Sequence, residues 1–428
     1  MKERIRKIAH SELVRNSAKL LSANVIAQAI GLLVYPILTR LYTPEDFGLL
    51  NLFLSIGGVL VLLATAEYQY AIVLPKKDED ARGLVHICGL LLLITTGIVL
   101  LSVPFSKPIA HLFNTPELAN WYWLMPLFVL AMGLWNILNY WYIRRKQFGS
   151  ISRYQISQSV LSAISKSGIG YIGYTHWGLI VCSVFAPFLS LIANVLFNKK
   201  QVLSLWVRTD SDERNRLMRE YKNFPLYTLQ RSFVNNLSSN LPSLLLTPFF
   251  GLGCLGHFGM ACTIALRPIT IVTGTLYQIL YERVARLVRD RVSIYKIICK
   301  TYLPLIGIVI PCMMVLWFAM PTLVHCFLGA DWIETARYIR YMLPWFTCIF
   351  MVAPLAFLSD IFGKQRFFLI IECVYFLLRA FAMGVGIYIQ DFDIAIMLLS
   401  ATGTVMLISQ LMCYLHFIRQ YESSLKLL

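Results

Sequence analysis

Long apolar runs separated by short polar segments extend from residue 18 to residue 418. A transmembrane helix needs about 20 mostly apolar residues to cross about 30 Å of hydrocarbon. Runs of that length predict twelve helices, at approximately 18–38, 48–74, 84–104, 120–143, 155–174, 178–197, 224–250, 258–281, 297–318, 337–361, 367–389 and 394–418. The fifth and seventh runs are the most polar of the twelve. The pattern predicts an all-α polytopic membrane protein.

The longest interruption in this pattern is the mixed-charge segment 198–223. It divides the chain into an N-terminal lobe of six helices (1–197) and a C-terminal lobe of six helices (224–428), with 198–223 as a cytoplasmic linker. Six helices per half would place two parallel lobes around a central cavity. Since an independent domain needs at least about 50 residues, no loop can house a catalytic domain, and we expect no enzyme activity.

Composition agrees with a membrane protein. Hydrophobic residues make up 58% of the chain and charged residues only 14%, whereas soluble proteins average about 25% charged. This excludes a soluble enzyme, and the aromatic content of 13% excludes a disordered chain. Ten cysteines without a CxxC pair, lying mostly in or beside apolar runs, are interpreted as small hydrophobic residues. Seven scattered histidines give no metal-ligand spacing, so we expect no metal.

The net charge of +16 is distributed unevenly over the predicted loops. With the N-terminus inside, alternate loops assign 30 of the 38 basic residues to the inner face and 4 to the outer face. Cytoplasmic loops of membrane proteins carry such an excess of Lys and Arg. Both termini are therefore predicted to be cytoplasmic. The basic loops face membrane lipids, and no nucleic-acid partner is required.

The remaining basic residues lie inside predicted helices, where each costs at least about 2.5–3.5 kcal/mol. These cations are Lys166, Arg231, Arg267 and Arg379. Acidic residues in or near the ends of spans are Glu67, Glu372 and Asp360. Such groups normally face a protein interior or a watery cavity.

Polar residues share helix faces with these cations. They are Gln155, Ser159 and Ser162 beside Lys166, Asn235 and Ser238 beside Arg231, and Gln278 beside Arg267. Spacings of three and four residues place each set on one side of its helix. The sequence thus predicts polar linings for a central cavity.

Two interpretations of the charged residues are open. A surplus of four cations over two span carboxylates favours an anionic substrate, and arginine suits phosphate because its donors form a planar fork. Alternatively, each cation pairs with a carboxylate or a helix carbonyl for structural reasons. Glu67, Glu372 and Asp360 are candidates for binding a coupling ion, H⁺ or Na⁺, or for structural pairing. No other cofactor is expected.

Several segments resemble a known family. The first loop reads Arg40-Leu41-Tyr42-Thr43-Pro44-Glu45-Asp46-Phe47-Gly48, and the second run ends in Ala71-Ile72-Val73-Leu74-Pro75. Later segments are Phe224-Pro225-Leu226-Tyr227, Asn240-Leu241-Pro242 and Phe327-Leu328-Gly329-Ala330-Asp331-Trp332. Together they resemble the polysaccharide (O-antigen) flippase branch of the multidrug/oligosaccharidyl-lipid/polysaccharide exporter superfamily, over nearly the whole chain.

The resemblance implies a multi-pass transporter of the bacterial inner membrane with two six-helix lobes. Its substrate would be an undecaprenyl-pyrophosphate-linked oligosaccharide, flipped by alternating access for O-antigen, lipopolysaccharide or other surface polysaccharide synthesis. Partners would be that lipid-linked oligosaccharide, with a polysaccharide polymerase and a chain-length regulator as further candidates. Arg40 and Glu67 lie inside matching segments, and Arg40 joins the cations expected to bind substrate.

Alternative functions differ in observable features. A drug antiporter of the same superfamily would favour an acidic cavity, which four cations against two acids oppose. A major facilitator would carry a glycine-aspartate-arginine signature where Lys76-Lys77-Asp78-Glu79-Asp80 stands. A membrane polymerase or ligase of the same pathway would usually carry a large outer loop. Turnover assays separate these classes, because a flippase leaves its lipid chemically unchanged.

Overall fold

The computed structural model describes residues 22–205 and 210–426, and every regular element among them is a helix. The basic segment 1–19, on which part of the orientation prediction depends, lies outside the described residues. Ten helices are long and apolar enough to cross a membrane within this part of the chain. The prediction of an all-α polytopic membrane protein is therefore confirmed.

The number of helices agrees with about twelve spans. One of the ten apolar helices, Phe224–Arg289, contains 66 residues and is broken at Gly251, whose φ of 79° and ψ of 177° are not helical. This break separates the predicted seventh and eighth helices. A further helix, α8 (Phe148–Tyr171), has 24 residues, enough to span a membrane at 1.5 Å per residue. Its serines, lysine and arginine keep it below the hydropathy of the other ten.

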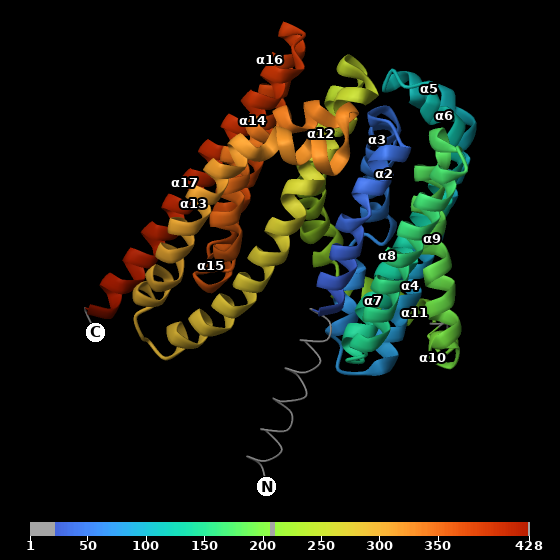
Figure 1. Cartoon of the computed structure of the whole chain (residues 1–428). Helices are drawn as coiled ribbons and strands as arrows, with labels where there is room; N and C mark the ends of the chain where they lie inside the picture. The colour runs from blue at the N-terminus through green and yellow to red at the C-terminus, as the bar shows by residue number, and fades with distance from the viewer. Residues whose placement is uncertain (1–21, 206–209, 427–428) are drawn as a thin grey trace. The chain divides into compact units, whose positions relative to one another are not determined.

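The described residues form two compact units, Met1–Leu252 and Gly253–Leu428, drawn in Figure 1. The boundary falls beside the Gly251 break, and the predicted linker 198–223 lies within the first unit. Unit 1 contains the span Ser22–Leu41, ending in α2 (Tyr35–Leu41), then α3 (Pro44–Ala64), η1 (Tyr68–Val73), α4 (Asp78–Leu101), η2 (Val103–Phe105), α5 (Ser106–Leu112), α6 (Glu117–Trp121), η3 (Tyr122–Leu124), α7 (Met125–Arg144), α8, α9 (Thr175–Phe197), α10 (Lys199–Leu203), α11 (Ser211–Glu220), η4 (Phe224–Thr228) and the first part of α12 (Leu229–Arg289).

Glycines allow close helix packing inside unit 1. A Cβ at Gly57 of α3 would lie 2.6 Å from the Phe128 ring of α7, and one at Gly133 of α7 would lie 2.4 Å from Leu92 of α4. Such distances are too short for side-chain carbons, so these helices approach more closely than alanine would permit. Without much hydrophobic drive between helices in lipid, close packing at small residues is a main source of their association.

The first motif of the resemblance has a local structural explanation. Thr43 is the N-cap of α3: its side chain accepts a hydrogen bond from the Asp46 backbone N–H, and the Asp46 carboxylate accepts one from the Thr43 N–H. Pro44 occupies the first turn, where no backbone donor is needed. A Cβ at Gly48 would lie 2.0 Å from the Leu252 carbonyl oxygen. The motif therefore starts a helix and permits a close backbone contact.

Unit 2 contains the rest of α12, α13 (Tyr295–Leu328), η5 (Ala330–Trp332), α14 (Ile333–Val352), η6 (Ala353–Leu355), α15 (Leu358–Ile361), α16 (Gln365–Ile389) and α17 (Phe392–Lys426). Helix α17 packs against α14 and α16. Gly386 of α16 lies against Ala395, and Gly403 of α17 lies against Trp345 of α14. One apolar cluster joins α12, α13, α16 and α17, with Phe357 fully buried.

Candidate functional site

The polar face of α8 packs against the first span. The Ser159 hydroxyl donates a hydrogen bond to the Ala27 carbonyl at 2.7 Å, and the Tyr42 hydroxyl donates to the Lys166 carbonyl at 2.7 Å. Gln155 and Ser162 on the same face are half-buried. Part of the face predicted to line a cavity is therefore protein contact, which explains how a helix so rich in serine is accommodated.

Arg40 lies in the last turn of α2. It is exposed and lines an open groove with residues from the end of α8. Lys166 is half-buried, one residue before a groove residue, Ser167. Thus α2 and α8 bring together two of the predicted cation positions at their packed ends.

Glu67 lies outside the candidate spans, since α3 ends at Ala64 and the next span begins at Asp78. The prediction that the second helix continues past it is wrong, because Ala66 and Glu67 adopt φ of 45° and 62°, which end a right-handed helix. Only 1% of Glu67 is exposed. Its carboxylate accepts a hydrogen bond from the Gln69 amide at 2.6 Å and another from Ser232.

The charge of Arg231 acts on the Glu67 carboxyl. Burial raises the pKa of the Glu67 carboxyl above its usual value, while the hydrogen bonds from Ser232 and Gln69 and the charge of Arg231 oppose the rise. Arg231 itself is exposed. The structure thus brings together one predicted cation and one predicted acid in unit 1. The acid is buried and the cation is exposed.

The remaining polar residues of the first part of α12 differ in exposure. Asn235 is exposed, whereas Ser238 is buried. Two further amides, Asn236 and Asn240, bond to each other at 3.0 Å and lie near Gly58 of α3. Their four-residue spacing inside an apolar run is the sequence signal for this pair, of which only Asn240 belongs to a segment of the resemblance.

In unit 2, Arg267 lies on α12 beyond the Gly251 break and is half-buried. Its carbonyl accepts a hydrogen bond from the Thr270 hydroxyl at 2.9 Å. Gln278 is exposed, eleven positions along the same helix. Both residues are therefore reachable from the surface of this unit.

Arg379 is the most deeply buried of the predicted cations, with 6% of its surface exposed. Its guanidinium carbon lies 5.3 Å from the Trp345 ring centre and 5.1 Å from the Tyr375 ring centre. Cys262 of α12 is also in its electrostatic environment. Contact with an aromatic face stabilises a cation by about 2 kcal/mol when water is excluded. The sequence predicted the shared face with Tyr375, but gave no sign of Trp345.

The other predicted acids of unit 2 lie on α15 and α16. Glu372 is half-buried on α16, and Asp360 is exposed at α15. Both are in the electrostatic environment of the buried Tyr414. No cluster of three or more His, Cys, Asp or Glu residues suited to a metal occurs among the described residues.

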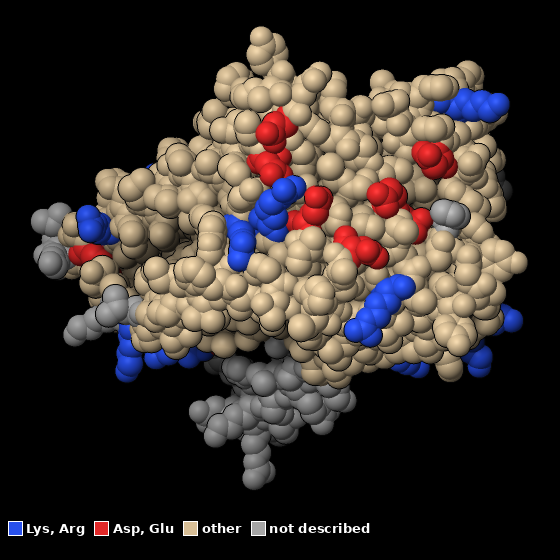
Figure 2. All heavy atoms as spheres, turned by 45° about the horizontal axis from the view of Figure 1, so that its top comes forward, with Lys and Arg blue, Asp and Glu red and all other residues tan. Residues whose placement is uncertain are grey.

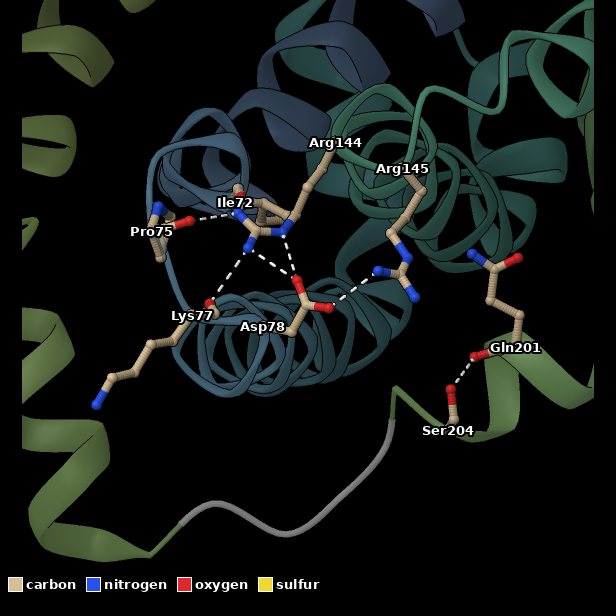
Figure 3. A network of polar contacts seen from close by, with 8 residues as sticks. All are labelled: Ile72, Pro75, Lys77, Asp78, Arg144, Arg145, Gln201 and Ser204. Atoms are coloured by element: carbon tan, nitrogen blue, oxygen red, sulfur yellow. Dashed lines mark hydrogen bonds and ion pairs between the residues drawn. The ribbon is translucent and has the colours of Figure 1, made fainter.

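Arg144 is a charged residue whose role sequence reasoning missed. Figure 3 shows its guanidinium reaching from the end of α7 to the segment before α4. It donates to the carbonyls of Ile72 (3.3 Å), Pro75 (2.6 Å) and Lys77 (3.2 Å), and it pairs with the Asp78 carboxylate at 2.9 Å. The neighbouring Arg145 pairs with the other Asp78 carboxylate oxygen at 2.9 Å and lies 5.7 Å from the Trp141 ring centre, but donates to none of these backbone carbonyls.

This arrangement gives the Ala71-to-Pro75 motif a structural function. The 3-10 turn η1 ends at Val73, and Arg144 donates to the Ile72 carbonyl in its last turn and to the Pro75 carbonyl that follows it. The sequence signal for this contact is a basic pair at a helix end, together with a proline-ended segment that is followed by acidic residues.

Comparison with known proteins gives a consistent family and fold. Residues 37–337 match the family model described as "Polysaccharide biosynthesis protein". A curated relative, the succinoglycan biosynthesis transport protein ExoT of Rhizobium meliloti (strain 1021), is 21% identical over 308 residues. The match covers 69% of this chain and 58% of that protein, so the chain spans less than two thirds of the relative's length.

Two solved structures have the same fold. An inward-facing multidrug resistance MATE family transporter of the MOP superfamily aligns with a TM-score of 0.72 and 13% identity, covering 95% of this chain and 99% of that one. The lipid II flippase MurJ, in an inward closed conformation, aligns with a TM-score of 0.70 and 13% identity, covering 97% and 92%. The chain therefore shares the fold of these two proteins.

Proposed function

Because the chain belongs to the polysaccharide biosynthesis protein family, we propose that it flips an undecaprenyl-pyrophosphate-linked oligosaccharide across the bacterial inner membrane by alternating access. The product would serve the synthesis of O-antigen or another surface polysaccharide. The family match over residues 37–337 carries this proposal. The membrane helices and the superfamily fold support a transporter rather than an enzyme.

The cations in the helices supply the proposed contacts to pyrophosphate. Arg231 is exposed and Arg267 is half-buried, so their guanidinium groups can form charge-assisted hydrogen bonds to phosphate oxygens. Lys166 adds a point charge. Arg379, held on two aromatic rings, would contribute a positive potential within the low-dielectric interior. Arg40 lies in the last turn of α2, at a helix end.

The polar side chains beside these cations are proposed to accommodate the sugars. Asn235 and Gln278 are exposed, and Gln155 is half-buried. Amides both donate and accept hydrogen bonds, which matches the mixed donors and acceptors of sugar hydroxyls. Ser159 is already bonded to the first span and is therefore a weaker contributor than the amides.

The proposed orientation has both termini in the cytoplasm. Figure 2 shows a face on which Lys and Arg side chains are few and acidic side chains accompany them. At the end of α7 in unit 1, Arg144 and Arg145 share the Asp78 carboxylate (Figure 3). The excess of Lys and Arg in the loops predicted to be cytoplasmic supports the proposed orientation.

Glu67 is the proposed site of a coupling ion, H⁺ or Na⁺. It is a buried carboxyl outside the candidate spans, and burial raises its pKa. Glu372 and Asp360 are the alternatives in unit 2. Structural pairing of Glu67 with Arg231 predicts no ion dependence, so transport measured with and without a proton or sodium gradient separates the two roles.

Flipping of a fluorescent lipid-linked oligosaccharide in proteoliposomes tests the function. We expect wild-type protein to transfer the lipid between leaflets chemically unchanged, and Arg267→Ala and Arg379→Ala to be slower. Arg286→Ala, which removes an exposed residue paired with Glu282, is the control. Full activity in both variants would exclude the cation role. Cleavage or extension of the lipid would instead indicate a polymerase or ligase, and transport of a cationic drug would indicate an antiporter.

A further inference from the structure

A groove of about 670 Å³ lies between the ends of α2 and α8 in unit 1. Its lining consists of Ile37, Arg40, Leu41, Ser167, Gly168, Tyr171 and Ile172. All seven residues belong to the same compact unit. The groove therefore does not depend on how the two units are arranged.

Tyr42 fixes the two helices that form the groove. Its hydroxyl donates to the Lys166 carbonyl at 2.7 Å, and its ring leaves no space for a Cβ at Gly170, which would lie 2.8 Å from the ring. Tyr42 itself is only 2% exposed. The distance between α2 and α8 is thus set by buried contacts, and the groove is a built feature of the unit.

The groove combines an apolar wall with two polar groups. Ile37, Tyr171 and Ile172 are 52%, 87% and 70% exposed, so they form an apolar surface open to the surroundings. Arg40 is exposed at one side. The Ser167 hydroxyl is buried and has no hydrogen-bond partner among the described residues. Buried polar groups are normally satisfied, so this hydroxyl can donate to a group bound in the groove.

We propose that this groove binds an anionic phospholipid of the surrounding bilayer. The phosphodiester would accept hydrogen bonds from Arg40 and Ser167, and one acyl chain would lie on Ile37 and Ile172. Both helices end here, Leu41 closing α2 and Tyr171 closing α8, which is the level of lipid headgroups and interfacial aromatics. A single arginine matches the single negative charge of a phosphodiester, whereas a pyrophosphate would require more positive charge.

Native mass spectrometry of the full chain, titrated with phosphatidylglycerol, tests this site. We expect one molecule to remain bound to wild-type protein, and Arg40→Gln to weaken that binding about tenfold through loss of a charge-assisted hydrogen bond. Phosphatidylcholine with the same chains should bind more weakly, because its headgroup has no net charge. Glycerol phosphate, which lacks acyl chains, should not be retained.

A second variant fills the groove without removing charge. A Cβ at Gly168 would meet no atom within 4 Å, so Gly168→Phe should fold normally and exclude the acyl chain. Gly97→Phe, at an equally open position on α4, and Lys107→Gln on α5 are the matched controls and should bind as wild type. Unchanged binding in both Arg40→Gln and Gly168→Phe would overturn the proposal. Stronger, Arg40-dependent retention of undecaprenyl pyrophosphate would also overturn it, by assigning the groove to the transported lipid.

Discussion

Each unit contains an arginine that is largely buried, Arg144 in unit 1 and Arg379 in unit 2, and different interactions stabilise the two side chains. In unit 1, the Arg144 side chain is 11% exposed and donates to three backbone carbonyls and a carboxylate at a helix end. In unit 2, Arg379 is 6% exposed and contacts two aromatic rings near the middle of α16. The N–H groups of Arg144 are used in hydrogen bonds to backbone carbonyls and a carboxylate. Arg379 instead places positive charge near the middle of a predicted span, where the membrane is least polar.

This difference separates a structural role from a functional one. A cation at a helix end lies near the membrane surface and costs little to place there. A cation near the centre of a span is costly and is normally retained for function. Arg231 is a third case, an exposed cation beside the buried Glu67. The expected consequences of substitution differ accordingly.

The largest effect is expected at Arg379. Arg379→Ala should slow flipping by about a hundredfold and lower the free energy of unfolding by about 2–4 kcal/mol, because it removes the cation and empties the space between two rings. Proteoliposome transport and thermal unfolding measure the two effects. Arg379→Lys keeps the charge but loses planar stacking, so it should recover more transport than Arg379→Met. Equal transport in the Lys and Met variants would contradict a charge-dependent role.

The next effect concerns stability alone. Arg144→Ala should lower the free energy of unfolding by about 2–3 kcal/mol, because carbonyls before α4 lose their donors. Arg145→Ala is the matched control: its 43% exposed side chain makes one contact to Asp78, and surface ion pairs contribute about 1 kcal/mol or less. Thermal unfolding of both variants decides the point. Equal destabilisation would show that the backbone contacts of Arg144 contribute nothing beyond its charge.

Arg231→Gln should give a smaller effect, seen in transport and not in stability. Flipping should fall about tenfold, through loss of a charge-assisted contact, while the unfolding temperature stays near that of wild type. Arg219→Gln, an exposed position on α11, is the control. A large loss of stability with normal transport would place Arg231 with Arg144 as a structural residue.

The smallest effect is a pH dependence at Glu67. Burial raises its pKa from 4.5, so the folded protein retains a proton that the unfolded chain releases. The free energy of unfolding should therefore fall as pH rises from about 4.5 through the raised pKa. Glu67→Gln should lack this slope, whereas Asp360→Asn, at an exposed site, should keep it. Parallel pH profiles for wild type and Glu67→Gln would contradict the assignment.

Much of the fold was predictable because hydrocarbon thickness fixes helix length. Run lengths located the spans, and even the polar α8 was recognised as a helix. Helix ends were less predictable: the second run continues apolar past Ala64, and only the left-handed turn at Ala66 and Glu67 ends it. For the candidate site, the sequence predicts which charged and polar residues lie in the spans, but not which side chains they contact. Spacing placed Arg379 with Tyr375, but the contact with Trp345, from another helix, has no counterpart in local sequence.

The sequence by itself determined that this protein crosses a membrane many times and retains four cations within its helices, because apolar length and the cost of buried charge are properties of residues and spacing. Tertiary structure decided how individual charges are used. It placed Arg144 on the carbonyls before α4, Arg379 between two rings, and Arg40 in a groove with an unsatisfied serine. Each of these arrangements joins segments far apart in the chain, and side-chain environment depends on such packing rather than on the residue itself.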